Sequence, residues 1–291
     1  MNFKGTIVPL VTPFHADETV DFDTLARLVE FHAARGATAL MPTALTGEGP
    51  LLNEEETRAV WDTVFALSPL PVIPAVVTTR TRTAMRLAEY AYQHGAAALM
   101  AAPILPELYA GRSPEDAVGF YEDVAAATPL PLILFNYPSL TGIDLTAPVA
   151  ARLAEIETVV AIKESTGEAR RVHAIHRAAP RLQVICGSPV TALESFALGC
   201  KAWITGILNV VPEAGAALMA ETDPAAAREI YYRQILPVSD WIARTNNPSG
   251  VIKAGVTLRG IDCGAPRRPG RPLSAEVWSE FARSLKEEMV R

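Results

Sequence analysis

Eight short apolar segments alternate with amphipathic segments over the first three quarters of the chain, and this alternation restricts the fold more than any other feature. The apolar segments are continuous runs, which is typical of parallel strands covered on both faces. Apolar residues between them recur at helical spacing, as at Leu25, Leu28 and Val29. The predicted strands are residues 6–9, 39–42, 72–76, 98–101, 132–135, 159–163, 183–186 and 202–205.

This alternation predicts an α/β fold, a (β/α)8 TIM barrel with a C-terminal helical extension. A doubly wound open sheet is the alternative, but no Gly-x-Gly-x-x-Gly follows the first strand, which disfavours a dinucleotide-binding version. After Pro224 the alternation gives way to helical patterns near 225–243, 248–259 and 274–289. We therefore expect a catalytic barrel over residues 1–223 and a three-helix extension, packed on it, over residues 224–291.

Composition restricts the partners. The 291 residues carry a net charge of -6, which gives no basic footprint for nucleic acid. No apolar run approaches the ~20 residues that span a bilayer, and the first residues lead into a short strand rather than a signal peptide. Three widely spaced cysteines suit reduced thiols. We expect a cytoplasmic protein that binds neither nucleic acid nor membrane.

Lys163 ends the sixth predicted strand, and the ends of barrel strands are where such folds place their chemistry. Apolar walls would lower the pKa of this lysine and leave a neutral amine able to attack a carbonyl. The same position also fits a solvated lysine where a buried strand reaches the surface. The segment alone therefore leaves imine chemistry and an ordinary surface lysine open.

Other residues at or after the ends of predicted strands can be explained by a structural role as well as by a functional one. The hydroxyl and amides of Thr46-Gly47-Glu48 can hold a carboxylate or form an ordinary loop. We expect Glu48 to brace its own turn through backbone hydrogen bonds, and Glu164 to point to the side of the strand opposite Lys163. His173 and His176 have a spacing that can bind metal, but without an apparent third ligand a solvated helix face is favoured.

Four motifs occur in order at matching strand ends and carry a resemblance over nearly the whole chain. They are Thr46-Gly47-Glu48 with Leu52 and Glu55, Asn136-x-Pro138-x-x-Thr141-Gly142, Ile162-Lys163-Glu164-Ser165-Thr166-Gly167, and Asn209-Val210-Val211-Pro212. In these motifs the chain resembles the dihydrodipicolinate synthase / N-acetylneuraminate lyase family of class I aldolases and dehydratases. The resemblance implies a Schiff-base-forming lyase that acts on pyruvate, a related 2-oxo acid or a 2-keto-3-deoxy sugar acid. The reaction would be aldol cleavage, condensation or dehydration.

The resemblance also implies roles for single residues. Lys163 would form the imine, whose protonated form is an electron sink that stabilises a carbanion. Ala44, Leu45 and Thr46 would bind the 2-oxo acid carboxylate through backbone amides and the Thr46 hydroxyl. The positions that line the imine pocket are matched by Phe135, Gly187 and Ile204. The resemblance implies neither a metal nor an organic cofactor, and it favours a homotetramer built as a dimer of dimers.

Several positions depart from the family pattern. Family members usually have a tyrosine at the Phe135 position and a hydroxyl residue at the Leu45 position, and together these move protons. Dihydrodipicolinate synthases also usually have a tyrosine in the loop that here reads Ile104-Leu105-Pro106, and an arginine at the Leu140 position. We therefore expect a lyase other than dihydrodipicolinate synthase proper. That synthase remains one alternative, and a catalytically impaired 2-oxo-acid-binding protein is the other.

Two tyrosines are candidates to replace the missing proton donor. Tyr137 lies two residues past Phe135, and side chains two apart in an extended segment share a face. Tyr109 lies in the predicted loop after the fourth strand. Each also fits packing or anchoring of its loop.

Overall fold

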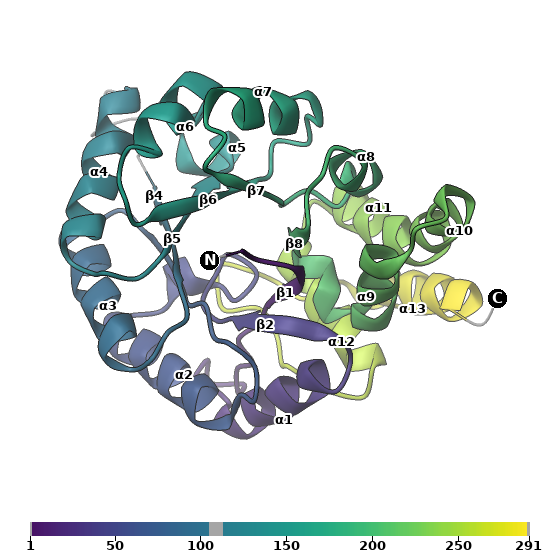
Figure 1. Ribbon diagram of the computed structural model, residues 1–291. Helices are drawn as coiled ribbons and strands as arrows, with labels where there is room; N and C mark the ends of the chain where they lie inside the picture. Colours follow the sequence, from purple (N-terminus) through teal and green to yellow (C-terminus); the bar gives the residue numbers. More distant parts are fainter. Residues whose placement is uncertain (1, 105–112, 290–291) are drawn as a thin grey trace. The chain divides into compact units, whose positions relative to one another are not determined.

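The computed structural model describes residues 2–104 and 113–289. By its contacts the chain divides into two compact units, Met1–Lys4 with Pro71–Ile204, and Gly5–Leu70 with Thr205–Arg291. Over the described residues, eight strands alternate with helices along the chain, and further helices follow the last strand (Figure 1). The predicted (β/α)8 barrel with a C-terminal helical extension is confirmed.

The first unit contains six parallel strands in one continuous sheet. Along the sheet they follow the order β8-β7-β6-β5-β4-β3. The strands are β3 (Ala75–Thr78), β4 (Leu99–Pro103), β5 (Leu132–Asn136), β6 (Val159–Glu164), β7 (Gln183–Cys186) and β8 (Ala202–Ile204). The helices between them are α3 (Thr81–Gln93), α4 (Pro114–Ala126), α5 (Pro138–Thr141), α6 (Ala147–Leu153), α7 (Arg170–Ala178) and α8 (Ala192–Ala197).

The third strand begins later than the predicted 72–76. Pro71 and Pro74 have no N–H to donate to a ladder, so the regular strand starts at Ala75. The carbonyl of Pro74 still accepts from the Met100 N–H at 3.0 Å, so the residue just before β3 is already hydrogen-bonded to β4. The other strands lie within two residues of their predicted bounds.

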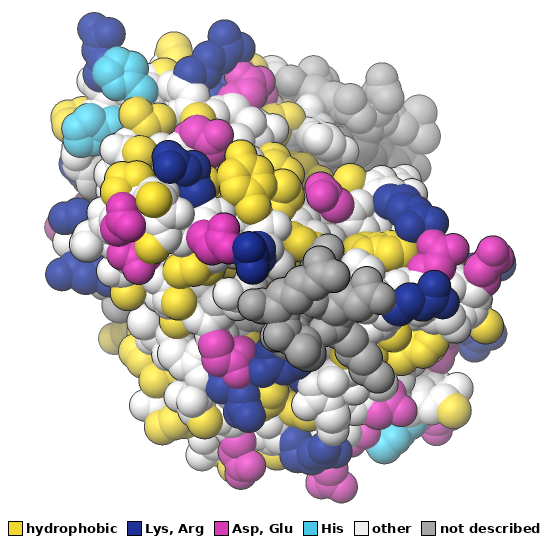
Figure 2. Space-filling model, turned by 90° about the vertical axis from the view of Figure 1, so that its right-hand side faces the viewer, with side chains coloured by type: hydrophobic (Ala, Val, Ile, Leu, Met, Phe, Trp, Pro, Cys, Tyr) yellow, Lys and Arg dark blue, Asp and Glu magenta, His cyan; other side chains and the backbone are white. Residues whose placement is uncertain are grey.

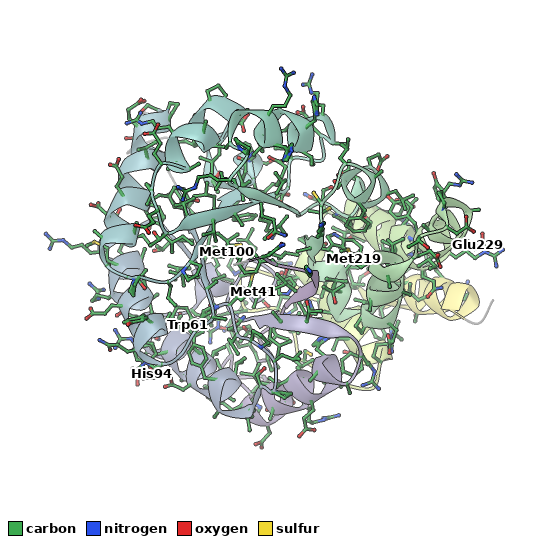
Figure 3. The ribbon with its side chains drawn as sticks, in the orientation of Figure 1. Met41, Trp61, His94, Met100, Met219 and Glu229 are labelled. Carbon is green, nitrogen blue, oxygen red and sulfur yellow. The ribbon has the colours of Figure 1, made fainter. Side chains whose placement is uncertain are left out.

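The second unit contains the parallel strands β1 (Gly5–Pro9) and β2 (Ala37–Met41). Its buried side chains include Met41 at the end of β2 and Trp61 on α2 (Figure 3). The helices of this unit are α1 (Phe22–Ala33), α2 (Glu54–Leu67), α9 (Pro212–Ala220), α10 (Pro224–Ile230), α11 (Leu236–Thr245), α12 (Pro248–Leu258) and α13 (Ala275–Met289). Asn53 caps α2, its side chain accepting from the Glu56 N–H at 2.8 Å.

The helices after Pro224 correspond to the three predicted helical patterns. The first pattern covers α10, a π-helical turn at Tyr231–Ile235, and α11. The second and third are α12 and α13. The division of the chain at 223/224 stays a prediction.

The described surface agrees with the charge balance of the sequence. On the face drawn in Figure 2, basic and acidic side chains are interspersed rather than gathered into one basic patch. None of the described helices is long and apolar enough to cross a membrane.

Candidate active site

Lys163 lies near the end of β6 and its side chain is largely buried, with the residue 8% exposed. Burial disfavours the charged ammonium and lowers the pKa of Lys163 from 10.5 to about 7. In the ladder between β5 and β6, Lys163 pairs with Phe135, and its Nζ lies 4.3 Å from the centroid of that ring. Near neutral pH a large share of this amine is therefore neutral and able to act as a nucleophile.

The lowered pKa predicts how the reactivity of Lys163 depends on pH. Only the neutral amine attacks a carbonyl, so the rate of adduct formation with a 2-oxo acid should rise with pH, with a midpoint near 7. An ordinary lysine, with a pKa of about 10.4, would give a midpoint several units higher. Initial rates of borohydride-stable adduct formation between pH 5.5 and 9.5 would measure this midpoint. A midpoint above pH 9 would contradict the expected effect of burial.

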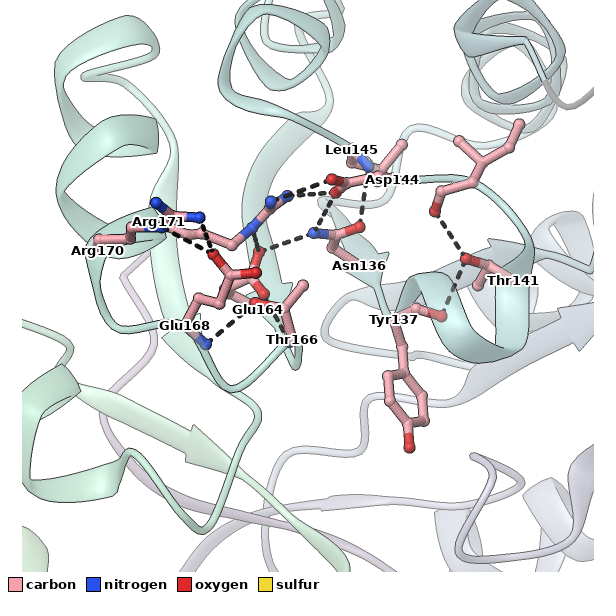
Figure 4. A network of polar contacts seen from close by, with 11 residues as sticks. Asn136, Tyr137, Thr141, Asp144, Leu145, Glu164, Thr166, Glu168, Arg170 and Arg171 are labelled. Atoms are coloured by element: carbon pink, nitrogen blue, oxygen red, sulfur yellow. Dashed lines mark hydrogen bonds and ion pairs between the residues drawn. The ribbon is translucent and has the colours of Figure 1, made fainter.

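Glu164 follows Lys163 in β6, so its side chain points to the other side of the strand. Its carboxylate joins the polar network drawn in Figure 4. Its carboxylate accepts from Asn136 Nδ2 at 2.8 Å, from Arg171 Nε at 3.3 Å and from the Thr166 N–H at 2.7 Å. Arg171 also forms an ion pair with Asp144. The network joins the ends of β5 and β6 to α7, so it fixes the backbone that carries Lys163.

Glu164→Gln should lower the free energy of unfolding by about 1–3 kcal/mol, because a buried charged hydrogen-bond acceptor is lost beside Arg171. The chain offers a matched control in Glu168, which pairs with Arg170 at 2.8 Å but is 44% exposed in its side chain. Glu168→Gln should change stability by less than about 1 kcal/mol, since exposed pairs contribute little. Urea unfolding of both variants measures the difference. Equal effects would show that the buried network adds nothing.

Ser165 is a residue of this region that the sequence reasoning missed. Its N–H donates to the Asn136 carbonyl at 3.0 Å, which extends the ladder one residue past β6. Its Oγ is buried and has no hydrogen-bond partner among the described residues. Lys163 and Ser165 are two apart in extended backbone, so their side chains share a face. That spacing was the signal available in the sequence.

The structure places two further predicted residues beside this segment. Gly187 follows β7, and a Cβ added there would lie 2.1 Å from Ser165 Oγ, so only glycine fits against the hydroxyl. Tyr137 immediately precedes α5; its ring centroid lies 6.1 Å from that of Phe135, and its ring points away from the polar network (Figure 4). Ile204 ends β8 and is fully buried. The candidate Tyr109 and the departure at Leu105 lie outside the described residues.

Ala44, Leu45 and Thr46 form a tight turn in the second unit. The Glu48 N–H donates to the Leu45 carbonyl at 2.9 Å, and the Gly49 N–H donates to the Ala44 carbonyl at 3.1 Å. The turn needs its glycines, because a Cβ on Gly49 would lie 1.9 Å from the Thr43 carbonyl oxygen. A Cβ on Gly206 would lie 2.8 Å from Thr46 Oγ1, so the Thr46 hydroxyl sits close to the turn that follows β8.

Glu48 does not brace its own turn, and that prediction is wrong. Its carboxylate accepts from the Arg267 N–H at 2.8 Å and forms an ion pair with Lys253 Nζ at 2.8 Å. It therefore holds the C-terminal segments of the second unit. Asn209 of the last motif has a similar role, because its Nδ2 donates to the Pro9 carbonyl at 2.8 Å and its Oδ1 accepts from the Val11 N–H at 3.2 Å.

His173 and His176 lie on α7 and are exposed, as a solvated helix face predicts. Among the residues that the structure describes, no group of three His, Cys, Asp or Glu side chains is arranged to hold a metal ion.

Comparison with known proteins extends the likeness to the whole chain. The model of the Dihydrodipicolinate synthetase family matches residues 2–288. The chain belongs to this family. A 4-hydroxy-tetrahydrodipicolinate synthase of Archaeoglobus fulgidus is 33% identical over 292 residues, covering 98% of each chain, and that of Geotalea daltonii is 33% identical over 291 residues, with the same coverage.

Solved structures show the same family fold. The chloride-inhibited dihydrodipicolinate synthase of Acinetobacter baumannii, solved with pyruvate, has a TM-score of 0.90 and 30% identity, and the match covers 99% of each chain. The dihydrodipicolinate synthase of Aquifex aeolicus has a TM-score of 0.89 and 29% identity over 98% of each chain. The family resemblance of the sequence is thus confirmed.

Proposed function

We propose that this member of the dihydrodipicolinate synthetase family is a Schiff-base-forming lyase, of the class I aldolase or dehydratase type. Its substrate would be pyruvate, a related 2-oxo acid or a 2-keto-3-deoxy sugar acid. The observation that carries the proposal is the buried Lys163 beside the Phe135 ring, with a pKa lowered to about 7. The A. baumannii relative solved with pyruvate supports the substrate class.

In the proposed reaction the neutral Lys163 amine attacks the ketone carbon, and loss of water gives a C=N bond. Once protonated, this imine accepts the electron pair released when the adjacent carbon loses a proton or a carbon–carbon bond breaks. By family resemblance, Ala44, Leu45 and Thr46 would bind the carboxylate of a 2-oxo acid through backbone amides and the Thr46 hydroxyl. No step of this scheme requires a cofactor.

A borohydride experiment tests the proposal directly. Incubation with pyruvate followed by reduction should add the mass of one reduced pyruvate imine, and peptide mapping should place it on Lys163. An adduct at another lysine, or none at saturating pyruvate, would overturn the proposal. A sugar-acid panel with detection of both pyruvate and dehydration products would then identify the reaction.

Two alternatives are distinguished by activity. Dihydrodipicolinate synthase itself is supported by the names of the curated relatives, but Phe135, Leu45 and Leu140 stand where that enzyme usually has proton-transfer and carboxylate-binding groups. Condensation of pyruvate with aspartate semialdehyde at ordinary enzyme rates would favour the synthase. An adduct without turnover of any aldehyde or sugar acid would favour a 2-oxo-acid-binding protein.

The Ser165 hydroxyl, which has no hydrogen-bond partner in the described part of the chain, joins Tyr137 and Tyr109 as a candidate proton-transfer group. General acid–base assistance is typically worth about 10²–10⁴-fold. Ser165→Ala should therefore lower the rate of pyruvate C3 proton exchange by about 10²-fold or more while the Lys163 adduct still forms, and Ser165→Thr should keep most of the exchange. Exchange in deuterated water, followed by NMR, measures this rate. Unchanged exchange in Ser165→Ala would return the role to the tyrosines.

We also propose a cellular location and an oligomeric state. A cytoplasmic protein agrees with the three buried cysteines, which are free thiols. By family resemblance we propose a homotetramer built as a dimer of dimers, which sedimentation analysis would test.

A further inference from the structure

The ring of Phe135 covers the amine of Lys163. The Lys163 Nζ lies 4.3 Å from the ring centroid. The two residues are paired in the β5–β6 ladder, which places their side chains next to each other on one face of the sheet. Phe135 is 2% exposed, so little water screens the contact. A cation at this distance is attracted to the electron-rich face of an aromatic ring, more strongly where both are desolvated.

Neighbouring groups hold this ring in place. The Phe135 N–H donates to Tyr121 Oη at 3.2 Å, and Tyr121 Oη donates to the Ala101 carbonyl at 2.8 Å. Tyr121 is fully buried, and burial raises the pKa of its phenol, so this bridge stays protonated. The Tyr137 ring packs at 43° to the Phe135 ring. The aromatic face beside Lys163 is therefore fixed by main-chain and packing contacts.

Among the described residues of this unit, little else compensates a positive charge at Lys163. Glu164 and Arg171 belong to the network on the opposite side of the strand. Cys186 on β7 influences Lys163 electrostatically, but burial raises the pKa of its thiol to about 12, so it is neutral at physiological pH. The ring face is thus the contact that offsets part of the desolvation of the cation.

We propose that Phe135 is a cation-binding residue of the active site: its ring face stabilises the positive charge on Lys163 Nζ, in the free ammonium and in the protonated imine. The part that concerns the imine rests on the proposed function. In this view the position where the family usually has a proton-donating tyrosine retains only the electrostatic contribution of an aromatic ring.

Fluorinated phenylalanines separate this role from that of an apolar wall. Replacing Phe135 in turn with 4-fluoro-, 3,5-difluoro- and pentafluorophenylalanine removes negative charge from the ring face with little change of shape. Competitive labelling with acetic anhydride at varied pH, read by peptide mass spectrometry, gives the pKa of Lys163. We expect this pKa to fall stepwise, by about 0.4 to 1.5 across the series.

The same series at Phe120, whose ring packs edge-to-face on Tyr121, is the control and should leave the pKa of Lys163 unchanged. Thermal unfolding of each protein checks that the fold is retained. An unchanged Lys163 pKa across the Phe135 series would overturn the cation-binding role.

Borohydride trapping with pyruvate, done on the same proteins, separates the two claims. If the adduct forms but the pKa of Lys163 is the same across the Phe135 series, the proposed lyase function is retained and the role of Phe135 is overturned. If the pKa of Lys163 falls stepwise but the unmodified protein forms no adduct, the proposed lyase function and the imine part of the inference are overturned. The contact between the Phe135 ring and the Lys163 ammonium would still stand. We expect the pKa of Lys163 to fall stepwise and the amount of adduct formed at pH 8.5 to decrease along the Phe135 series. At this pH the free amine is neutral and the protonated imine is charged, so only the imine loses stabilisation when the ring face becomes less negative.

Discussion

Lys163→Met should abolish the borohydride-stable pyruvate adduct and lower turnover of the substrate by about 10⁴-fold or more, the range seen when a covalent nucleophile is removed. Methionine has a similar length and no amine, so the buried space stays filled. The burial that lowers the pKa of Lys163 also makes its charged form costly. Stability of the variant should therefore be equal to or higher than that of the parent protein.

Two measurements keep this prediction specific. Urea unfolding of Lys163→Met at pH 7.5 must give a free energy no lower than that of the parent, so that lost activity is not lost structure. Lys201→Met, at an exposed position of the same unit, should retain both adduct and turnover. Residual turnover above about 1% in Lys163→Met would mean that the lysine is not the nucleophile.

Regular features of the chain could be predicted because they depend on local physics. The continuous apolar runs gave seven of the eight strands to within two residues, and Asn53 could be recognised as a helix cap from its own neighbourhood. The strand that was misplaced has Pro71 just before its predicted range and Pro74 within it, and their missing N–H groups matter only once a neighbouring strand is known. The local pattern therefore predicted which strands and helices form, and hydrogen bonding to neighbouring strands determined where each strand begins and ends.

Tertiary partners were the part that the sequence could not supply. The Glu48 carboxylate was expected to bind within its own turn, but its partners are Lys253 and Arg267, more than 200 residues away. The sequence also could not predict that the Ser165 hydroxyl has no hydrogen-bond partner among the residues that the structure describes, because this depends on every group packed around it. By contrast, Glu164 could be assigned to the far side of its strand from the two-residue period alone.

Lys253→Met should lower the free energy of unfolding by about 3–5 kcal/mol, because it leaves the Glu48 carboxylate buried without its cation. The side chains of this pair are 3% and 4% exposed, and the contact is 2.8 Å. Lys253 Nζ also donates to the Ala265 carbonyl at 3.1 Å and lies 4.3 Å from the Phe14 ring centroid. The lysine thus joins α12 to the Glu48 turn and to the segment that follows α12.

A double variant distinguishes the buried charge from lost packing. Glu48→Gln keeps an acceptor for the Arg267 N–H and removes the charge, so Lys253→Met with Glu48→Gln should be more stable than Lys253→Met alone by at least about 1 kcal/mol. Arg233→Met, which breaks the exposed pair with Glu229, should cost less than about 1 kcal/mol. Urea unfolding at pH 7.5 gives the free energy of unfolding of the parent protein and of these three variants. If the double variant were no more stable than Lys253→Met, the penalty would come from the lost methylene packing and the Ala265 hydrogen bond, and the buried charge of Glu48 would carry none of it.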